Sequence, residues 1–225
     1  MIAFAPVKYY LCVYQLMLNH YRLGDIPKMK GVFIVIEGLD GSGKTTQAKL
    51  LARKLRKSQD AFFTAEPSQG QIGKFIRSRI LYGNKRVITS VEALLFAADR
   101  IDHIQNEVRP AVSDGKIVIS DRYLYSSLAY QGSAGLSLDW IQAINQHAVK
   151  PDLALFIDVA PETVFKRLRR KKSVMENLAT QQKVREIYLN YVAKGELVRI
   201  DGERERTVVA KEVFKTVEDF LKTRG

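Results

Sequence analysis

The sequence predicts a three-layer α/β fold, in which helices flank a five-stranded parallel sheet. Two observations support this prediction. Five short apolar runs alternate with amphipathic stretches of helical length. A chain of 225 residues with 46% hydrophobic and 27% charged residues can also bury one sizeable core, and no Pro-, Gly- or Ser-rich linker divides it. Such sheets bind ligands at the carboxyl ends of their strands, so we expect the functional site at that edge.

Strands are expected where β-branched and aromatic residues form a short run. These runs occupy residues 32–36, 61–65, 117–120, 153–157 and 197–200. Helices are expected where apolar residues recur three and four positions apart, as Ala48, Leu51, Ala52 and Leu55 do after the first strand. By that criterion the helices occupy residues 47–57, 71–81, 90–109, 138–147, 161–170, 178–194 and 207–222.

Residues 1–28 are interpreted as an extension that precedes a domain of residues 29–225. The sequence MKGVFIVIEGLDG from Met29 already forms a complete start for such a domain. The apolar segment at residues 9–18 is interrupted by Gln15, is short for a membrane span, and has no clear small-residue cleavage site after it. We therefore expect the natural start at Met29, with an extra packed helix as the alternative.

Composition limits the compartment and the partners. Cys12 is the single cysteine, so an internal disulfide is impossible and a reducing, cytoplasmic location is the simpler expectation. No apolar run is long enough to span a bilayer, so we expect no membrane partner. The formal net charge of +12 suggests phosphate-bearing partners. The basic residues are nevertheless spread along the chain and partly offset by acids, which favours a solvated basic surface over a nucleic-acid site.

The strongest motif lies between residues 32 and 46, where the strand VFIVI runs into the sequence EGLDGSGKTT. It fits the pattern GxxxxGK[ST], whose loop NH groups surround phosphates at the N-terminus of the next helix. Lys44 then reaches the β- and γ-phosphates of a nucleoside triphosphate, and the Thr45 hydroxyl enters the coordination shell of Mg²⁺. The loop residues expected to bind the triphosphate are Gly38, Leu39, Asp40, Gly41, Ser42, Gly43, Lys44, Thr45 and Thr46.

A second polar cluster follows the strand KIVIS. Asp121 and Arg122 place an acid and a fixed guanidinium at the carboxyl end of that strand, where a transferring phosphoryl group needs a positive partner. A triphosphate loop alone does not distinguish a kinase from a GTPase switch, a transporter motor or a helicase. The remaining motifs of the chain must therefore decide the class.

Five segments together resemble the thymidylate kinase family, in order and spacing from Met29 to the C-terminus. They are GLDGSGKTTQAKLL, the pair Glu66-Pro67, LLFAADR at residues 94–100, SDRYLYSSLAYQG at 120–132 and KPDLALFIDV at 150–159. The resemblance implies the P-loop NTPase fold with a short lid. It also implies a homodimer and phosphoryl transfer from MgATP to the 5′-phosphate of dTMP, giving ADP and dTDP.

The resemblance assigns the catalytic roles. Arg122 bridges the acceptor phosphate and the transferring group, Lys44 neutralises phosphate charge, and Asp121 contacts the metal through its water shell. Arg77 is a candidate for the acceptor phosphate, and a surface arginine beside Arg79 is an alternative of equal weight.

Recognition of dTMP is also implied by the resemblance. Phe96 stacks on thymine, or is a core aromatic as the alternative, and Arg100 on the same helix face donates to a base carbonyl. Tyr130 crowds the 2′ position of the sugar. Asp40 accepts from the 3′-hydroxyl, or caps the NH groups of its own loop. The full set implied for dTMP is Asp40, Glu66, Arg77, Phe96, Arg100, Arg122, Ser127, Tyr130 and Gln131.

The basic stretch KRLRRKK at residues 166–172 resembles the start of the family's mobile lid. Arg167 within it matches a residue that stacks on adenine in the ATP site. Residues 201–205, after the last strand, match a loop that closes over adenine, mainly through backbone groups.

The catalytic cation of the lid is where the chain departs from the family. Relatives often have an arginine two residues before the lid glutamate, but this chain has Val174 before Glu176. The phosphate loop contains no arginine either. We therefore expect Arg169 or Arg170 to supply the charge.

Two other functions stay open at this point. A P-loop kinase for another nucleotide or deoxynucleoside would use most of the same residues, and one methyl group separates dTMP from dUMP, worth only about 1 to 3 kcal/mol in an apolar pocket. A remote alternative is an ATPase stimulated by nucleic acid, motivated by the phosphate loop and the net charge. The constellation of Phe96, Arg100 and Tyr130 and the lack of a second comparable domain argue against it.

Overall fold

A computed structural model describes residues 31–82, 87–167 and 177–224. Its centre is a five-stranded sheet in which every neighbouring pair is parallel, with the strand order β2-β3-β1-β4-β5. The strands are β1 (Val32–Gly38), β2 (Ala61–Ala65), β3 (Ile117–Asp121), β4 (Leu153–Asp158) and β5 (Val198–Asp201). All five were expected from the apolar runs, and the predicted α/β class is confirmed.

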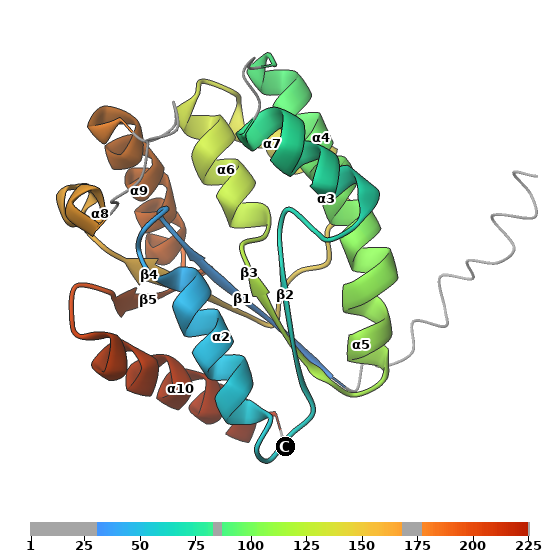
Figure 1. Cartoon of the computed structure of the whole chain (residues 1–225), viewed down its shortest axis with the longest axis vertical. Coiled ribbons are helices and arrows are strands. Elements are labelled where there is room, and N and C mark those ends of the chain that lie inside the picture. The colour runs from blue at the N-terminus through green and yellow to red at the C-terminus, as the bar shows by residue number, and fades with distance from the viewer. Residues whose placement is uncertain (1–30, 83–86, 168–176, 225) are drawn as a thin grey trace, which may run out of the picture.

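Helices cover the sheet on both sides (Figure 1). On one side α2 (Lys44–Leu55) packs against α10 (Arg206–Lys222). Helix α2 contacts β1, β2 and β3, and α10 contacts β4 and β5. On the other side α6 (Leu124–Ser133) contacts β1 and α9 (Leu178–Ala193) contacts β4. The sheet is therefore the middle of three layers.

The remaining described helices lie between β2 and β3 or on either side of β4 in the sequence. The predicted helix at 71–81 is present as α3 (Gln71–Phe75) followed by the π-helical turn η1 (Ile76–Leu81). The predicted helix at 90–109 runs as α4 (Thr89–His103), the π-helical turn η2 (Ile104–Val108) and α5 (Arg109–Ser113). The others are α7 (Leu138–Ile144) and α8 (Pro161–Arg167), whose predicted continuation to residue 170 lies outside the described residues.

Helix α6 was not predicted from the sequence. Its inner face mixes apolar and polar side chains, because the buried residues are Tyr125, Ser127, Leu128, Ala129, Tyr130 and Gln131. That inner face lines the site described below, which is why polar side chains occupy it.

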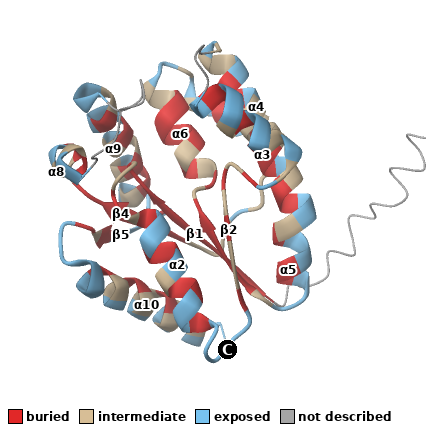
Figure 2. Cartoon of the chain, viewed as in Figure 1, coloured by how far each residue is buried: buried red, intermediate tan, exposed pale blue. Residues whose placement is uncertain are grey.

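The core lies along the central strands. Every residue of β1 is buried, and Phe33, Ile34, Val35 and Ile36 are fully so. Figure 2 shows that the central strands are buried, whereas the edge strands β2 and β5 are only partly so, and that the helices also carry exposed residues. Burial on both faces explains why this strand reads as a continuous apolar run rather than an alternating one.

The strand order decides where the functional groups meet. Asp121, the last residue of β3, is opposite Ala65 of β2 and Ile36 of β1. The loop after β1, the turn at Glu66 and the turn at Arg122 therefore leave the sheet side by side at its carboxyl edge.

No helix in the described part of the chain has the length and hydrophobicity needed to cross a membrane. Residues 1–28, interpreted as an extension, and the lid residues Arg169 and Arg170 lie outside the described residues.

Candidate active site

The loop between β1 and α2 has the backbone of a phosphate-binding loop. Gly43 caps α2 with a φ of 94°, in the region that favours glycine. At Gly38 a Cβ atom would lie 2.6 Å from the Ser42 hydroxyl and 2.9 Å from the Ile157 carbonyl oxygen. The hydroxyl of Ser42 is buried without a hydrogen-bond partner among the described residues. The loop thus presents a tight backbone and a free hydroxyl at the N-terminus of a helix.

Lys44 turns back over this loop. Its side chain is only 6% exposed, and its ammonium group donates to Asp40 Oδ1 at 3.0 Å and to the Leu39 carbonyl oxygen at 3.4 Å. These contacts hold the ammonium group of Lys44 against the loop, where it can bind phosphate oxygens.

Arg122 reaches the same carboxylate from the end of β3. Its backbone has a φ of 74°, which is unusual for a residue with a side chain, and its NH donates to the Ile36 carbonyl oxygen. The guanidinium forms an ion pair with Asp40, donates to the Ser126 hydroxyl at 2.8 Å and lies 4.9 Å from the centre of the Tyr130 ring. The structure therefore brings together the loop, the arginine and the tyrosine that the sequence proposed for the site.

The charges of this cluster reinforce one another. Burial alone would raise the pKa of Asp40, but the positive charges of Arg122 and Lys44 outweigh it and hold that pKa well below its usual range. Burial likewise opposes the charged form of Arg122, and the Asp40 carboxylate outweighs it, so the pKa of the guanidinium rises well above its usual value. Asp40 and Arg122 are therefore both ionised near neutral pH.

A metal ion fits beside this cluster. The hydroxyl of Thr45 donates a hydrogen bond to Asp121 Oδ2, while Oδ1 of the same carboxylate is buried and unpartnered within the described ranges. Those ranges contain no cluster of three or more His, Cys, Asp and Glu residues that could hold a metal alone. Mg²⁺ prefers oxygen ligands and usually combines one or two protein groups with waters and substrate phosphates, so Thr45 and Asp121 suit it.

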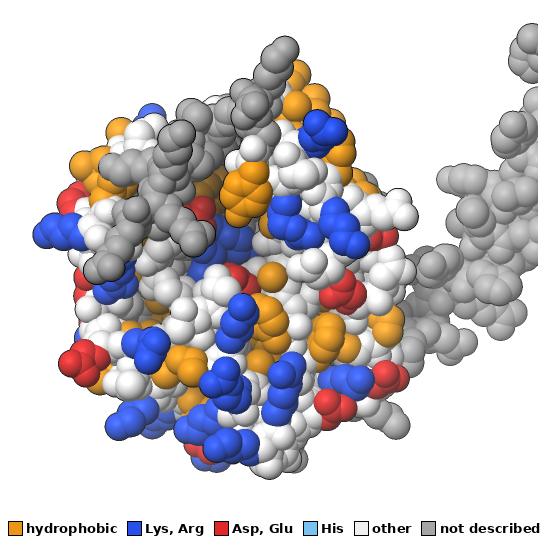
Figure 3. Space-filling model, in the orientation of Figure 1, with side chains coloured by type: hydrophobic (Ala, Val, Ile, Leu, Met, Phe, Trp, Pro, Cys, Tyr) orange, Lys and Arg blue, Asp and Glu red, His pale blue; other side chains and the backbone are white. Residues whose placement is uncertain are grey.

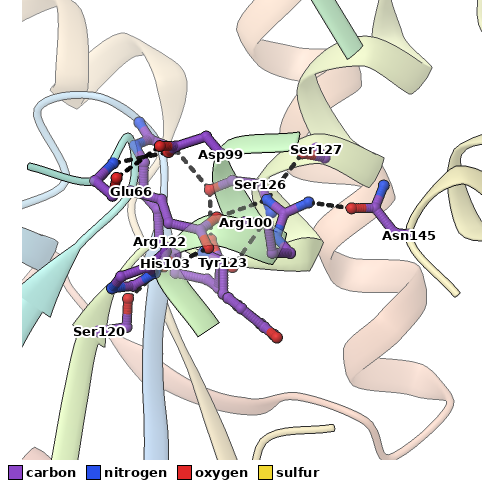
Figure 4. A network of polar contacts seen from close by, with 12 residues as sticks. Glu66, Asp99, Arg100, His103, Ser120, Arg122, Tyr123, Ser126, Ser127 and Asn145 are labelled. Carbon is purple, nitrogen blue, oxygen red and sulfur yellow. Dashed lines mark hydrogen bonds and ion pairs between the residues drawn. The ribbon is translucent and has the colours of Figure 1, made fainter. Parts of the chain in front are cut away.

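A buried polar cluster lies on the acceptor side (Figure 4). Arg100 of α4 is 1% exposed and donates to Glu66 Oε2 at 2.7 Å, to the Ser127 hydroxyl at 3.1 Å and to the Asn145 side-chain oxygen. Its Nε atom has no partner among the residues described. A fully buried arginine held by a carboxylate and two neutral groups is positioned to present its remaining NH group to a ligand.

His103 hydrogen-bonds to Glu66. Its Nδ1 lies 3.2 Å from Glu66 Oε1 and its Nε2 lies 2.7 Å from the Thr64 hydroxyl. Burial lowers the pKa of this histidine, but the hydrogen bond and charge of Glu66, with the charges of Glu107 and Asp99, outweigh it and raise the pKa above the ordinary value. The imidazole thus hydrogen-bonds to the carboxylate that holds Arg100, and the nearby carboxylates favour its protonated form.

The other residues proposed from the sequence make fewer contacts with the two clusters described above. Phe96 is half-buried, and the amide nitrogen of Gln131 donates to Glu92 at 2.9 Å while its Oε1 is buried and has no partner in the described part of the chain. Arg77 donates to the Pro67 carbonyl oxygen and to the Gln69 side chain, so it faces the Glu66-Pro67 turn and is not a freely solvated arginine. Arg167 donates to the Gly202 carbonyl oxygen at 3.2 Å, which joins α8 to the loop at residues 201–205.

Sequence reasoning missed several residues of the site. Glu37, Ser126, His103 and Asn145 all hydrogen-bond to the groups above, and none of them was a candidate. One signal was available for Glu37, because a carboxylate at the end of a wholly apolar strand is rarely buried without a partner. For Asn145 no local signal exists, since its partner Arg100 lies 45 positions away.

The described basic residues are distributed widely over the face of the molecule seen in Figure 3. Figure 3 shows Lys and Arg side chains spread over much of one face, with Asp and Glu among them. This distribution is typical of a solvated surface.

Comparisons with known proteins agree on one family. A family model described as thymidylate kinase matches residues 36–213. The probable thymidylate kinase of Pyrobaculum aerophilum is 44% identical over 192 residues, which make up 84% of this chain and 98% of the relative. The corresponding protein of Methanocaldococcus jannaschii is 42% identical over 85% of this chain and 96% of its own length, and that of Pyrococcus abyssi is 42% identical over 76% and 86%. The family model covers most of the chain, including the phosphate loop, Arg100 and Arg122, and the relatives are more than 40% identical over most of their length, so the chain belongs to the thymidylate kinase family.

Proposed function

We propose that this protein transfers the terminal phosphoryl group of MgATP to the 5′-phosphate of dTMP and so produces ADP and dTDP for dTTP synthesis. The observation that carries the proposal is the convergence of Lys44 and Arg122 on Asp40, next to the buried pair of Arg100 and Glu66. Two cations beside a phosphate loop suit a phosphoryl donor, and buried polar groups with unpartnered atoms suit the polar edge of a nucleobase.

The transfer itself requires little covalent chemistry from the protein. The acceptor phosphate oxygen attacks the γ-phosphorus of ATP, and the bond from that phosphorus to the β-γ bridging oxygen breaks, so ADP leaves. Lys44 neutralises charge on the β- and γ-phosphates from the donor side, and Arg122 bridges the acceptor phosphate and the moving group. Catalysis then consists of holding both substrates in line within a field of fixed positive charge.

Mg²⁺ enters as part of the MgATP substrate and supplies further positive charge on the phosphate oxygens. The Thr45 hydroxyl would bind it directly, and Asp121 would bind it through a water molecule with the unpartnered Oδ1. This role also explains why β3 ends in an acid whose described side-chain partner is the Thr45 hydroxyl.

Thymine would be recognised by groups that remain available in the acceptor cluster. The Nε of Arg100 is a buried donor for a base carbonyl, and Gln131 Oε1 is a buried acceptor. Phe96 provides an aromatic face on the same helix as Arg100, and Ser127 lies beside the guanidinium. The ring of Tyr130, fixed against Arg122, would exclude a ribose 2′-hydroxyl.

On the donor side, adenine would lie between Arg167 and the loop at residues 201–205, which hydrogen-bond to each other. Arg169 or Arg170, in the adjoining lid, would bring a third cation to the transferring group. Their positions lie outside the described residues, so the sequence and the family resemblance alone support this part of the proposal.

A homodimer is part of the proposal. Val91, Leu94 and Ile101 on one face of α4 are 40%, 49% and 38% exposed, and Phe75 of α3 is 49% exposed. We call these four residues the α4 face. Figure 3 shows hydrophobic side chains gathered at the upper right, over α4. Exposed apolar residues at helical spacing suit contact with the same face of a second copy.

ATP and nucleoside monophosphates are cytoplasmic compounds, so a cytoplasmic location accompanies the proposed reaction. The interpretation of residues 1–28 as an extension before a natural start at Met29 is a separate proposal. Intact-mass measurement of the native protein decides it, because a mass that includes residues 1–28 contradicts the later start.

The decisive experiment is an ADP-release assay with MgATP in the presence of dTMP, dUMP, thymidine, other monophosphates or single-stranded DNA. We expect strong stimulation by dTMP, with dTDP as the second product. Stimulation by thymidine or DNA without any by dTMP would contradict the acceptor assignment while leaving the phosphate loop intact.

A further inference from the structure

Glu37 is a carboxylate in the middle of the protein core. It is the penultimate residue of β1, directly before Gly38, and its side chain is fully buried. None of the roles assigned above uses it. Burial raises the pKa of this group to about 7, against the opposing effects of Ser126, Arg122, Tyr188 and Tyr123. A buried acid is costly to maintain, so its contacts indicate its purpose.

Those contacts all come from the turn and helix that carry Arg122, and from one tyrosine. Oε1 of Glu37 accepts from the backbone NH groups of Tyr123 at 2.9 Å and Ser126 at 3.2 Å. Oε2 accepts from the Ser126 hydroxyl at 2.6 Å and from the Tyr188 hydroxyl of α9 at 3.1 Å. The carboxylate thus fixes the start of α6 through two backbone NH groups and the Ser126 hydroxyl, and the Tyr188 hydroxyl links it to α9.

The Ser126 hydroxyl links Glu37 to Arg122, the arginine proposed to bind the phosphate groups. The Ser126 hydroxyl has a single hydrogen, and it donates that hydrogen to Glu37. Its lone pairs are then left to accept from Arg122 Nη1, which lies 2.8 Å away. The second bond therefore depends on the first. If the hydroxyl turned its hydrogen toward Arg122, two donors would face each other and the hydrogen bond from Arg122 would be lost.

The backbone contact acts on Arg122 as well. Arg122 has a positive φ of 74°, and Tyr123, the next residue, is held by Glu37 through its NH group. A carboxylate on the phosphate-loop strand thus anchors both the turn that contains the arginine and the hydroxyl that orients its guanidinium.

We propose that Glu37 is a positioning residue for phosphoryl transfer, which sets the orientation of the Arg122 guanidinium through the Ser126 hydroxyl and the turn at Tyr123. The inference rests on the proposed role of Arg122 in bridging the two phosphate groups. It concerns the geometry of that arginine and does not require Glu37 to touch either substrate.

The test is Glu37→Gln. The amide keeps the shape of the side chain but replaces one acceptor oxygen with a donor NH₂ group, so the Ser126 hydroxyl loses the acceptor that orients its hydrogen. We expect kcat to fall about tenfold to a hundredfold, as for a small misplacement of a catalytic group, while the KM for MgATP changes by less than about threefold.

Two further variants separate positioning from simple damage to the core. Ser126→Ala should lower kcat similarly, and the double variant Glu37→Gln/Ser126→Ala should be little worse than either single one, since both act on the same bond. Tyr188→Phe removes a hydroxyl that lies 3.1 Å from both Glu37 Oε2 and the Ser126 hydroxyl. It keeps the bond from Ser126 to Glu37 and the bond from Arg122 to Ser126, so kcat should stay within about threefold of wild type. The fraction of folded protein is measured for every variant by circular dichroism.

Wild-type kcat in Glu37→Gln overturns the proposal, as does a kcat loss that is strictly additive with that of Ser126→Ala. A loss that merely follows the fraction of unfolded protein also overturns it. The assay uses whichever nucleoside monophosphate the wild-type enzyme phosphorylates. Failure of wild-type protein to use dTMP therefore contradicts the proposed function, whereas the ratio between variant and wild type tests Glu37 separately.

Discussion

Asp40 and Arg122 form an ion pair that joins the phosphate loop to the end of β3. The same carboxylate oxygen lies 3.0 Å from the ammonium of Lys44, so one acid holds both of the cations assigned to catalysis. Asp40 is also 44% exposed, which leaves part of the carboxylate open to a ligand. We therefore expect the pair to preorganise the cations before substrate arrives and to offer an acceptor to the sugar of the nucleotide.

Asp40→Asn should weaken this arrangement and the recognition of the 3′-hydroxyl together. An amide lacks the charge that pairs with Arg122 and is a weaker acceptor, so we expect kcat/KM for dTMP to fall about tenfold to a thousandfold. The measurement compares dTMP with its 3′-deoxy analogue. Wild type should prefer dTMP, and the variant should lose most of that preference. An unchanged preference would assign Asp40 to the loop alone.

Removal of the metal contacts should change the Mg²⁺ requirement. We expect Asp121→Asn and Thr45→Val to raise the Mg²⁺ concentration for half-maximal rate by about tenfold or more, at constant ATP, because each variant removes an oxygen assigned to the metal shell. Thr45→Ser is the matched control, since it keeps the hydroxyl and should stay close to wild type. Equal Mg²⁺ curves for all four proteins would contradict the assignment.

Protonation of His103 should stabilise the fold. Its folded-state pKa is raised by Glu66 and other nearby carboxylates, so its stabilising contribution is complete below pH 6.5 and is lost as pH rises through the raised value. We expect the free energy of unfolding, measured by urea denaturation at several pH values, to fall over a window that starts near pH 6.5. In His103→Gln that decrease should be smaller. A decrease of equal size in both proteins would point to another group.

The fold was predictable because its signals are local. The continuous apolar run of β1 and the motif that ends it indicate a parallel sheet and a phosphate loop, and both are present. Helix α6 is the exception, because its buried face combines the apolar Leu128 and Ala129 with the polar Ser127 and Gln131, and this mixture weakens the apolar periodicity that sequence analysis detects. The start of α2 at Lys44, three residues before the prediction, has a similar cause, since Gly43 is both loop and cap.

The site was predictable only in part, and the limit is physical. The motifs identified Lys44 and Arg122 by type and spacing, but the groups that hold them come from distant positions. Glu37 meets Ser126 across 89 positions, and Arg100 meets Asn145 across 45. Such pairings arise from packing and leave no periodic signal in the chain.

The α4 face gives a prediction about assembly. Leu94→Glu should place a charge in the centre of the proposed dimer contact and convert the dimer into a monomer, because burial of an unpaired carboxylate is strongly unfavourable. Light scattering after size-exclusion chromatography measures the mass. Val208→Glu is the matched control, since Val208 on α10 is 40% exposed and lies outside the α4 face. A monomeric wild-type protein, or a dimeric Leu94→Glu variant, would contradict the proposed interface.

The lid should supply a cation that the phosphate loop lacks. The loop has Gly41 and Ser42 where an arginine could stand, and the described part of the site contributes Lys44 and Arg122 to the transferring group. We therefore expect either Arg169→Ala or Arg170→Ala to lower kcat by up to about a thousandfold, with a smaller effect on the KM for dTMP. Lys171→Ala and Lys172→Ala remove equal charge from the same basic stretch and should change kcat by less than about threefold. If all four variants behave alike, the stretch acts through its overall charge; if neither arginine variant loses more than a few-fold, the cation comes from elsewhere in the enzyme.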